Sequence, residues 1–183
     1  MKVASKICRD ALDAGHRAIK AGVTTEEVDR VVHEYIISKG AYPSLLNRHK
    51  YPSSCTTSIN EAIAHGVPDQ RPLADGDMIT LGVSCCKDGY FSDIAETYCV
   101  GTVDEQGRKL ADVSQRALLK AIEICKPGMR WADVGNAVAS VAEPAGFSVV
   151  RNFPGRGLGK LFQQAPELPH HAGSGISGVM IPG

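Results

Sequence analysis

Apolar side chains follow a helical spacing through the first part of the chain. From Val3 to Ile19 they recur three and four residues apart, which predicts an amphipathic helix that ends near Gly22. The same spacing returns between Thr24 and Gly40, and the residues TTEE at its start are typical of a capping box. We therefore expect two consecutive helices at the beginning of the fold.

The middle of the chain changes to a β-strand pattern. After an irregular stretch that begins at Pro43, the runs DMITLGVSCC (77–86) and YFSDIAETYCV (90–100) are rich in β-branched and aromatic residues. Asp88-Gly89 lies between them, and Asp-Gly between two such runs favours a tight hairpin. We expect an antiparallel pair here, then helices over 104–125 and 131–145 and a strand over 147–153.

The two parts of the chain repeat one another. Residues 20–42 (KAGVTTEEVDRVVHEYIISKGAY) match residues 126–148 (KPGMRWADVGNAVASVAEPAGFS), with a glycine at both ends of each helical pattern. A duplicated unit of this kind implies a fold with internal pseudo-symmetry. The second copy should end in a hairpin like that of residues 77–100, and the sequence stops at Gly183 before it.

Composition describes an ordinary globular protein. The 183 residues are 43% hydrophobic and 22% charged, which suits one domain (1–183) with a buried core. Lys plus Arg and Asp plus Glu both number 20, so net charge does not favour nucleic acid or an anionic membrane. We expect no membrane span and no secretory signal. Six cysteines without a C-x-x-C pair predict free thiols in a reducing, intracellular compartment, either cytoplasmic or mitochondrial.

The glycine run GRGLGK (155–160) invites a phosphate-loop interpretation. Such a loop needs Ser or Thr after its lysine, and here Leu161 follows Lys160. A dinucleotide-binding motif needs a different glycine spacing and a helix behind it, whereas a Pro-rich run follows here. A tight loop with close backbone approach is the better interpretation.

Several longer stretches together resemble the type I methionine aminopeptidases of the eukaryotic kind. They are AGVTTEEVDRVVHE, GAYPSLLN, SCTTSINEAIAHGVPDQRPLADGDMI, KDGYFSDIAETYCVG, GFSVVRNFPGRGLGKLFQQAP and SGVM. The resemblance implies the pita-bread (creatinase/aminopeptidase) fold, an α+β architecture of two pseudo-symmetric helix-helix-strand halves around a curved antiparallel sheet. The first half would be 1–103, and the second half, 104–183, would be incomplete.

The resemblance also implies a metal site. Family members remove the initiator methionine with a water held between two divalent ions, which are bound by two Asp, one His and two Glu. Gly82 stands at the first aspartate, Asp93 retains the second, and Arg156 stands at the histidine. Gln163 replaces a histidine that contacts substrate, and both glutamates would lie beyond Gly183. With one ligand of five left, we expect no bound metal and no other cofactor.

The substrate side of the site is altered as well. By the same resemblance, His65 and Tyr51 are retained, while Arg48 and Thr56 replace a tyrosine and a cysteine of the methionine pocket. His65 is as consistent with a hydrogen-bonded core residue. A guanidinium is unfavourable in a thioether pocket, so we expect the pocket to have decayed with the metal site.

Some charged residues allow more than one interpretation. Arg156 would replace a metal ion by an ion pair with Asp93, or else point to solvent or to a partner. His170 and His171 are adjacent in a loop, and adjacent loop residues rarely bind the same metal ion. Acids of the sequence LADGD, Asp75 and Asp77, are more typical of turns than of catalysis.

These substitutions favour a catalytically inactive, pseudoenzyme-like relative that acts as a structural or binding component of a large assembly such as a ribosome. An uncovered sheet edge after residue 183 would need a protein partner. The alternative is an active methionine aminopeptidase represented by an incomplete chain. A further interpretation is contact with ribosomal RNA through basic residues, which are Arg48, Lys50, Arg151, Arg156 and Lys160.

Overall fold

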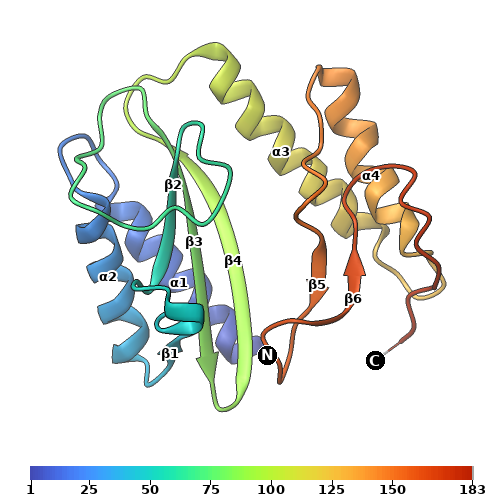
Figure 1. Cartoon of the computed structure of the whole chain (residues 1–183), viewed down its shortest axis with the longest axis horizontal. Helices are drawn as coiled ribbons and strands as arrows, with labels where there is room; N and C mark the ends of the chain where they lie inside the picture. The colour runs from blue at the N-terminus through green and yellow to red at the C-terminus, as the bar shows by residue number, and fades with distance from the viewer. Residues whose placement is uncertain (183) are drawn as a thin grey trace. The chain divides into compact units, whose positions relative to one another are not determined.

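A computed structural model of the chain describes residues 1–182 and divides them into two compact units (Figure 1). Unit 1 comprises Met1–Asp104 and the short segment Leu158–Phe162, while unit 2 comprises Glu105–Gly157 and Gln163–Gly183. We call Leu158–Phe162 the returning segment, because the chain comes back to unit 1 there. The organisation as a single domain over 1–183 stays a prediction, and the returning segment was not anticipated.

Unit 1 begins with the two predicted helices. Helix α1 spans Lys2–Ala18 and ends earlier than Gly22, while α2 spans Thr25–Ser38. The Thr24 side chain accepts a hydrogen bond from the backbone N–H of Glu27 at 3.2 Å, which confirms the expected cap. The apolar stripes of both helices are fully buried, with Leu12, Val28, Val32 and Ile36 at 0% exposure.

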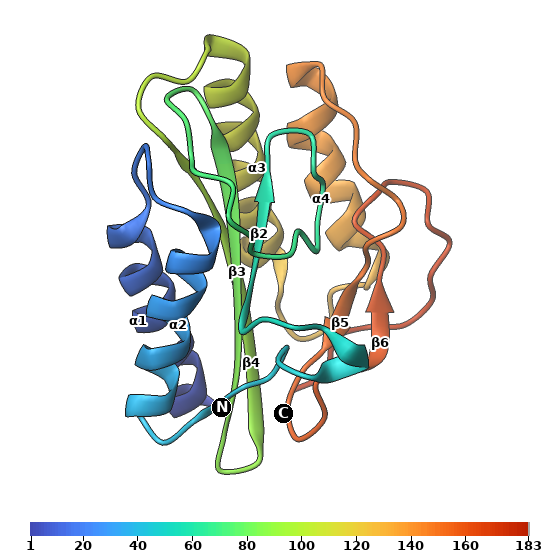
Figure 2. The same cartoon turned by 60° about the vertical axis from the view of Figure 1, so that its left-hand side comes forward.

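A four-stranded antiparallel sheet completes unit 1 (Figures 1 and 2). Its strands are β1 (Tyr42–Pro43), β2 (Cys55–Ile59), β3 (Met78–Lys87) and β4 (Tyr90–Cys99). Strand β3 is central, with β4 on one edge and β1 and β2 in succession on the other. Asp88 and Gly89 both have positive φ, as a tight hairpin turn requires, so the predicted hairpin is confirmed. Strand β2 lies in the stretch expected to be irregular.

Helices α1 and α2 pack on one face of this sheet. Alternate residues of β3, from Ile79 through Leu81 and Val83 to Cys85, are 0% exposed and join the helices in one core. Because side chains alternate along a strand, the intervening residues face away from the helices. Unit 1 therefore has one face covered by helices and a second face, directed away from them, that carries small and polar residues.

Unit 2 contains α3 (Glu105–Ile124), α4 (Ala132–Ala142) and a short hairpin of β5 (Gly155–Gly157) and β6 (Gln164–Leu168). Both helices were predicted, and a single 3₁₀ turn, Glu143–Ala145, extends α4. The strand expected over 147–153 is wrong. A strand needs a hydrogen-bonded neighbour, and among residues 1–182 none pairs with this segment.

The sequence repeat has a structural counterpart in each unit. In unit 1 the Gly22 N–H donates to the carbonyl of Leu73 at 2.7 Å, and in unit 2 the Gly128 N–H donates to the carbonyl of Met180 at 2.8 Å. Both glycines have φ +88°, a conformation that favours glycine. The return bonds also correspond, Leu73 N–H to Val23 and Met180 N–H to Met129, each at 2.8 Å. The predicted internal duplication is confirmed.

Candidate functional site

The second face of the unit 1 sheet carries most of the predicted site residues. We call it the open face; it consists of Thr56 and Ser58 of β2, Thr80, Gly82 and Ser84 of β3, and Phe91, Asp93, Ala95 and Thr97 of β4. The pairs Ser84–Asp93, Gly82–Ala95 and Thr80–Thr97 lie side by side in the strand register. Small and hydroxyl-bearing side chains therefore surround a single carboxylate.

Asp93 is the charged group of the open face. Its side chain is exposed, and Oδ1 accepts a hydrogen bond of 2.5 Å from Oγ of Ser84, which is 1% exposed. A buried hydroxyl that donates to one carboxylate oxygen fixes the orientation of the group. The carboxylate can then present its remaining lone pairs to a cation.

Gly82 contributes no side chain beside Asp93, and its neighbour occupies the space. A Cβ added at Gly82 would lie 2.4 Å from Oγ1 of Thr56, which is far inside van der Waals contact. The Cβ atoms of Thr56 and Ala95 would be at 3.8 and 3.9 Å, which is ordinary contact. The substitutions at positions 56 and 82 are therefore sterically coupled. The assignment of Gly82 to a lost metal ligand stays a prediction.

The loop that carries His65 is hydrogen-bonded to β2 near Thr57 and Ser58. The Gly66 N–H donates to Oγ of Ser58 at 3.1 Å, and the Thr57 N–H donates to the carbonyl of Gly66 at 2.9 Å. A Cβ on Gly66 would lie 2.2 Å from the Thr57 carbonyl oxygen, so only glycine permits this approach. His65 itself is exposed, which excludes the core interpretation. Its substrate-side role stays a prediction.

Tyr51 also contacts the loop that carries His65. Its hydroxyl lies 3.0 Å from the carbonyl oxygen of Cys55 and 2.9 Å from that of Gly66. Burial raises the pKa of Tyr51, so the phenol remains a proton donor. The structure thus gives Tyr51 a loop-anchoring contact, and its predicted place in a substrate pocket stays a prediction.

Arg48 packs against the returning segment. Its guanidinium carbon lies 4.5 Å from the ring centroid of Phe162, within the range of a cation–π contact. The Phe162 ring meets Phe91 edge-on with centroids 5.6 Å apart, and the Phe91 N–H donates to the carbonyl of Gly159 at 2.8 Å. Phe162 is 8% exposed. Sequence reasoning missed it, because only the fold shows that the chain returns to β4.

Arg156 and Gln163 belong to unit 2. Arg156 lies on β5, with Nε 3.7 Å from Oε1 of Glu167 on β6, and Gln163 is exposed. The proposed pairing of Arg156 with Asp93 joins two units and stays a prediction. No helix begins directly after GRGLGK in the described chain, so the phosphate-loop interpretation lacks its structural requirement.

The remaining candidate acids and histidines have ordinary roles. Asp77 accepts from the Ala74 N–H at 2.9 Å and pairs with Arg71, and Asp75 accepts from the Thr102 N–H at 2.8 Å, as expected of turn acids. His170 is half-buried, and burial lowers its pKa. No three His, Cys, Asp or Glu residues within 1–182 gather closely enough to hold a metal ion. Asp93 fits as one ligand, and the described residues do not fit a two-metal centre.

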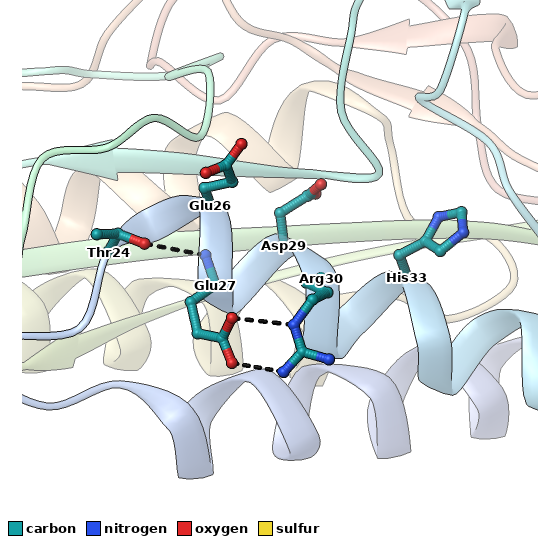
Figure 3. A pocket seen from close by; sticks show the side chains of 6 residues that line it. All are labelled: Thr24, Glu26, Glu27, Asp29, Arg30 and His33. Atoms are coloured by element: carbon teal, nitrogen blue, oxygen red, sulfur yellow. Dashed lines mark hydrogen bonds and ion pairs between the residues drawn. The ribbon is translucent and has the colours of Figure 1, made fainter.

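A shallow pocket lies along α2, away from the predicted site residues (Figure 3). It is lined by Thr24, Glu26, Glu27, Asp29, Arg30 and His33. Its charges are engaged within the protein: Glu27 pairs with Arg30, and Oδ1 of Asp29 accepts from the Ser54 and Cys55 N–H groups at 2.8 Å each. This pocket is best explained as the place where α2 secures the start of β2.

The chain is similar to methionine aminopeptidases in sequence and structure. It is 49% identical to methionine aminopeptidase 1A of Arabidopsis thaliana over all of its length and 46% of that relative. It is 41% identical to the human mitochondrial methionine aminopeptidase 1D, over 92% of this chain and 50% of the relative. The crystal structure of the Thermotoga maritima methionine aminopeptidase matches 99% of this chain and 73% of its own with TM-score 0.95 and 31% identity. The chain thus spans about half the length of these curated relatives.

Two expectations from the sequence are wrong in the light of these findings. The chain was expected not to be an enzyme, but its relatives at 41 and 49% identity are named as aminopeptidases. The chain was expected to use no cofactor, but the family model that matches it describes metallopeptidases, which act with divalent metal ions.

The expected fold agrees with the structure and with the comparisons. Among residues 1–182 no helix is both long and apolar enough to cross a bilayer. The pita-bread fold is confirmed by the match to the Thermotoga enzyme and by the repeated helix pair. The model of metallopeptidase family M24 aligns with residues 1–183. The chain therefore belongs to metallopeptidase family M24.

Proposed function

We propose that this chain acts in the removal of N-terminal methionine from peptides, as an aminopeptidase that depends on a divalent metal ion. The observation that supports this most directly is the exposed Asp93 carboxylate on the open face, held by Ser84 at 2.5 Å. A carboxylate in this setting binds cations, either a metal ion or the α-ammonium group of a peptide. The names of the relatives supply the substrate class.

The residues around Asp93 are uncharged, and their role would be to position a bound peptide. Thr56, Thr80 and Thr97 offer hydroxyl groups along the same face, and the hydroxyl oxygens of Thr80 and Thr97 lie 2.8 Å apart. A peptide that lies across these strands would find hydrogen-bonding partners for its backbone. The His65 loop and the Phe162–Arg48 contact bound this face at its two ends, and both would limit how far a peptide extends.

The test is release of methionine from a Met-Ala-Ser peptide by the purified chain with added Mn²⁺ or Co²⁺. Methionine release should stop with a chelator and should fall strongly in Asp93→Asn. The matched control is Asp88→Asn, which removes an exposed carboxylate from the turn of the same hairpin. Absence of release with every ion, or equal activity in Asp93→Asn, would contradict the proposal.

A second proposal concerns partners and place in the cell. Arg48, Lys50 and Lys160 of unit 1 have no carboxylate within ion-pair distance among residues 1–182. Arg48 and Lys160 contact the rings of Phe162 and Tyr90, which do not neutralise their charge, so a phosphate backbone can still attract them. Together with Arg151 and Arg156 they would contact a large ribonucleoprotein assembly, such as a ribosome, in a reducing intracellular compartment. Gradient sedimentation of a cell extract tests this: co-migration that is lost at high salt supports it, and migration as a lone small protein contradicts it.

A further inference from the structure

Two thiols face each other beneath the unit 1 sheet. Cys8 of α1 and Cys85 of β3 are both free and 0% exposed, and their Sγ atoms lie 3.2 Å apart. The Cys8 Sγ also lies 3.4 Å from the carbonyl oxygen of Ser92, and the Cys85 Sγ lies 3.4 Å from that of Ala4. The two residues are 77 positions apart in the chain, so only the folded state creates this contact.

The contact distinguishes the two thiols chemically. The hydrogen bond with Cys85 lowers the pKa of the Cys8 thiol, while the same bond and burial raise the pKa of Cys85. The thiolate is the nucleophilic form of cysteine. Cys8 is therefore suited to attack an oxidant first, and Cys85 is placed by its contact distance of 3.2 Å to resolve the product, losing its proton as it attacks.

We propose that Cys8 and Cys85 form a redox-sensitive pair that a peroxide converts into a disulfide between α1 and β3. The Cys8 thiolate attacks the O–O bond of hydrogen peroxide, which gives a sulfenic acid at Cys8 and one hydroxide that leaves as water. The Cys85 sulfur then attacks the Cys8 sulfur, the S–S bond forms, and the sulfenic hydroxyl leaves as water with the Cys85 proton. Overall, two thiols and one peroxide yield one disulfide and two waters.

The geometry requires little movement. A disulfide bond is about 2.05 Å long, so the sulfurs must approach by about 1 Å. The other cysteines are placed differently: Cys86 points to the opposite face of β3, Cys99 and Cys125 are exposed, and Cys55 is buried on β2. Among the described residues, Cys8 and Cys85 are the two thiols in direct contact.

The pair lies directly behind Asp93. Cys85 follows Ser84 on β3, and the Ser92 carbonyl that contacts Cys8 precedes Asp93 on β4. The Ser84–Asp93 hydrogen bond and the thiol pair thus occupy opposite faces of neighbouring positions in the same two strands. Oxidation would draw β3 towards α1 at this point and shift the support of the carboxylate. The thiol chemistry itself does not depend on the proposed aminopeptidase function.

The test is peptide mapping of the chain with Cys86, Cys99 and Cys125 changed to serine. The protein is treated with hydrogen peroxide, alkylated, and digested without reductant by trypsin and a glutamate-specific protease, which separates Cys55 from Cys85 at Glu61. We expect the peptide with Cys8 to be joined to the peptide with Cys85, and the link to disappear with dithiothreitol. It should form about tenfold faster in the folded protein than in urea.

Controls use the remaining buried thiol and the unfolded chain. Cys55→Ser should leave the rate of linkage unchanged, while Cys8→Ser should abolish it. The comparison of folded and urea-treated protein needs no substitution within the pair, so it decides the question even where Cys8→Ser does not fold. Equal linkage in urea, linkage through Cys55, or sulfinic acid at Cys8 without linkage would overturn the proposal.

Discussion

The contact between Thr56 and position 82 predicts a strong energetic coupling across the open face. In Gly82→Ala the new methyl group would lie 2.4 Å from Oγ1 of Thr56, whereas its other neighbours would lie at 3.8 Å or beyond. Gly82 does not have positive φ, so the backbone accepts alanine without strain. The hydroxyl of Thr56 is therefore the obstacle, and its removal should convert an unfavourable substitution into a favourable one.

The magnitudes follow from the two opposing effects. Overpacking in a well-packed region costs about 1–3 kcal/mol, and replacement of glycine by alanine in an allowed conformation contributes about 0.4–1 kcal/mol of stability. Gly82→Ala alone should thus lower the free energy of unfolding by about 1–2 kcal/mol. In a Thr56→Ala background the clash is absent, and the same substitution should raise it by about 0.4–1 kcal/mol. The coupling energy between the two sites is then about 2 kcal/mol.

Urea unfolding of the four proteins of a double-mutant cycle measures this coupling. Thr56→Val is the matched control, because valine keeps the branched shape without the hydroxyl, and Gly82→Ala should remain unfavourable beside it. Additive effects, with a coupling below about 0.5 kcal/mol, would refute the steric argument. The steric argument expects a coupling close to zero in the Thr56→Val cycle, so a coupling of similar size with alanine and with valine would show that the hydroxyl acts by polarity and not by volume.

Three further predictions concern other residues of unit 1. The Arg71 hydrogen bond lowers the pKa of Asp77 to about 2. The ionised carboxylate therefore contributes its full stabilisation above about pH 5, and about 2 kcal/mol of the free energy of unfolding is lost as the pH falls to 2. Acid denaturation measures this loss, which should be absent in Asp77→Asn. Phe162→Ala removes the ring that contacts Phe91, and hydrogen exchange at the Phe91 amide should accelerate at least about tenfold through local opening; unchanged exchange would contradict the docking of the returning segment. Tyr51→Phe removes the hydroxyl shared by the carbonyl groups of Cys55 and Gly66, and the Gly66 carbonyl keeps only the Thr57 N–H. The change should cost about 1 kcal/mol in thermal unfolding, and an unchanged midpoint would show that water replaces the phenol.

Regular elements with strong local signals were predictable from the sequence. The Asp88-Gly89 turn, the Thr24 cap and the paired glycines Gly22 and Gly128 each impose their own backbone geometry, and the structure shows all of them. The segment 147–153 failed because apolar, β-prone residues form a strand only beside a partner. Strand β2 was missed for the converse reason, since its five residues depend on β3 for their pairing.

The site was less predictable than the fold. Asp93 follows from motif spacing, but its support by Ser84 depends on the register of β3 against β4, which the sequence does not state. Phe162 is separated from Phe91 by many residues, and no local pattern joins them. The expectation of an inactive protein, drawn from Gly82 and Arg156, was wrong, because relatives at 41 and 49% identity are named as methionine aminopeptidases.

The returning segment makes the connection between the two units more than a single hinge. The chain passes from unit 1 to unit 2 after Asp104, returns at Leu158, and leaves again after Phe162. A protease that cut only the link between Asp104 and Glu105 would therefore not release a free fragment, because the distal piece would still hold the first through Phe162 and its contacts. The nicked protein should run as one species under native conditions and as two in denaturant, which is the behaviour of a fragment-complementing pair.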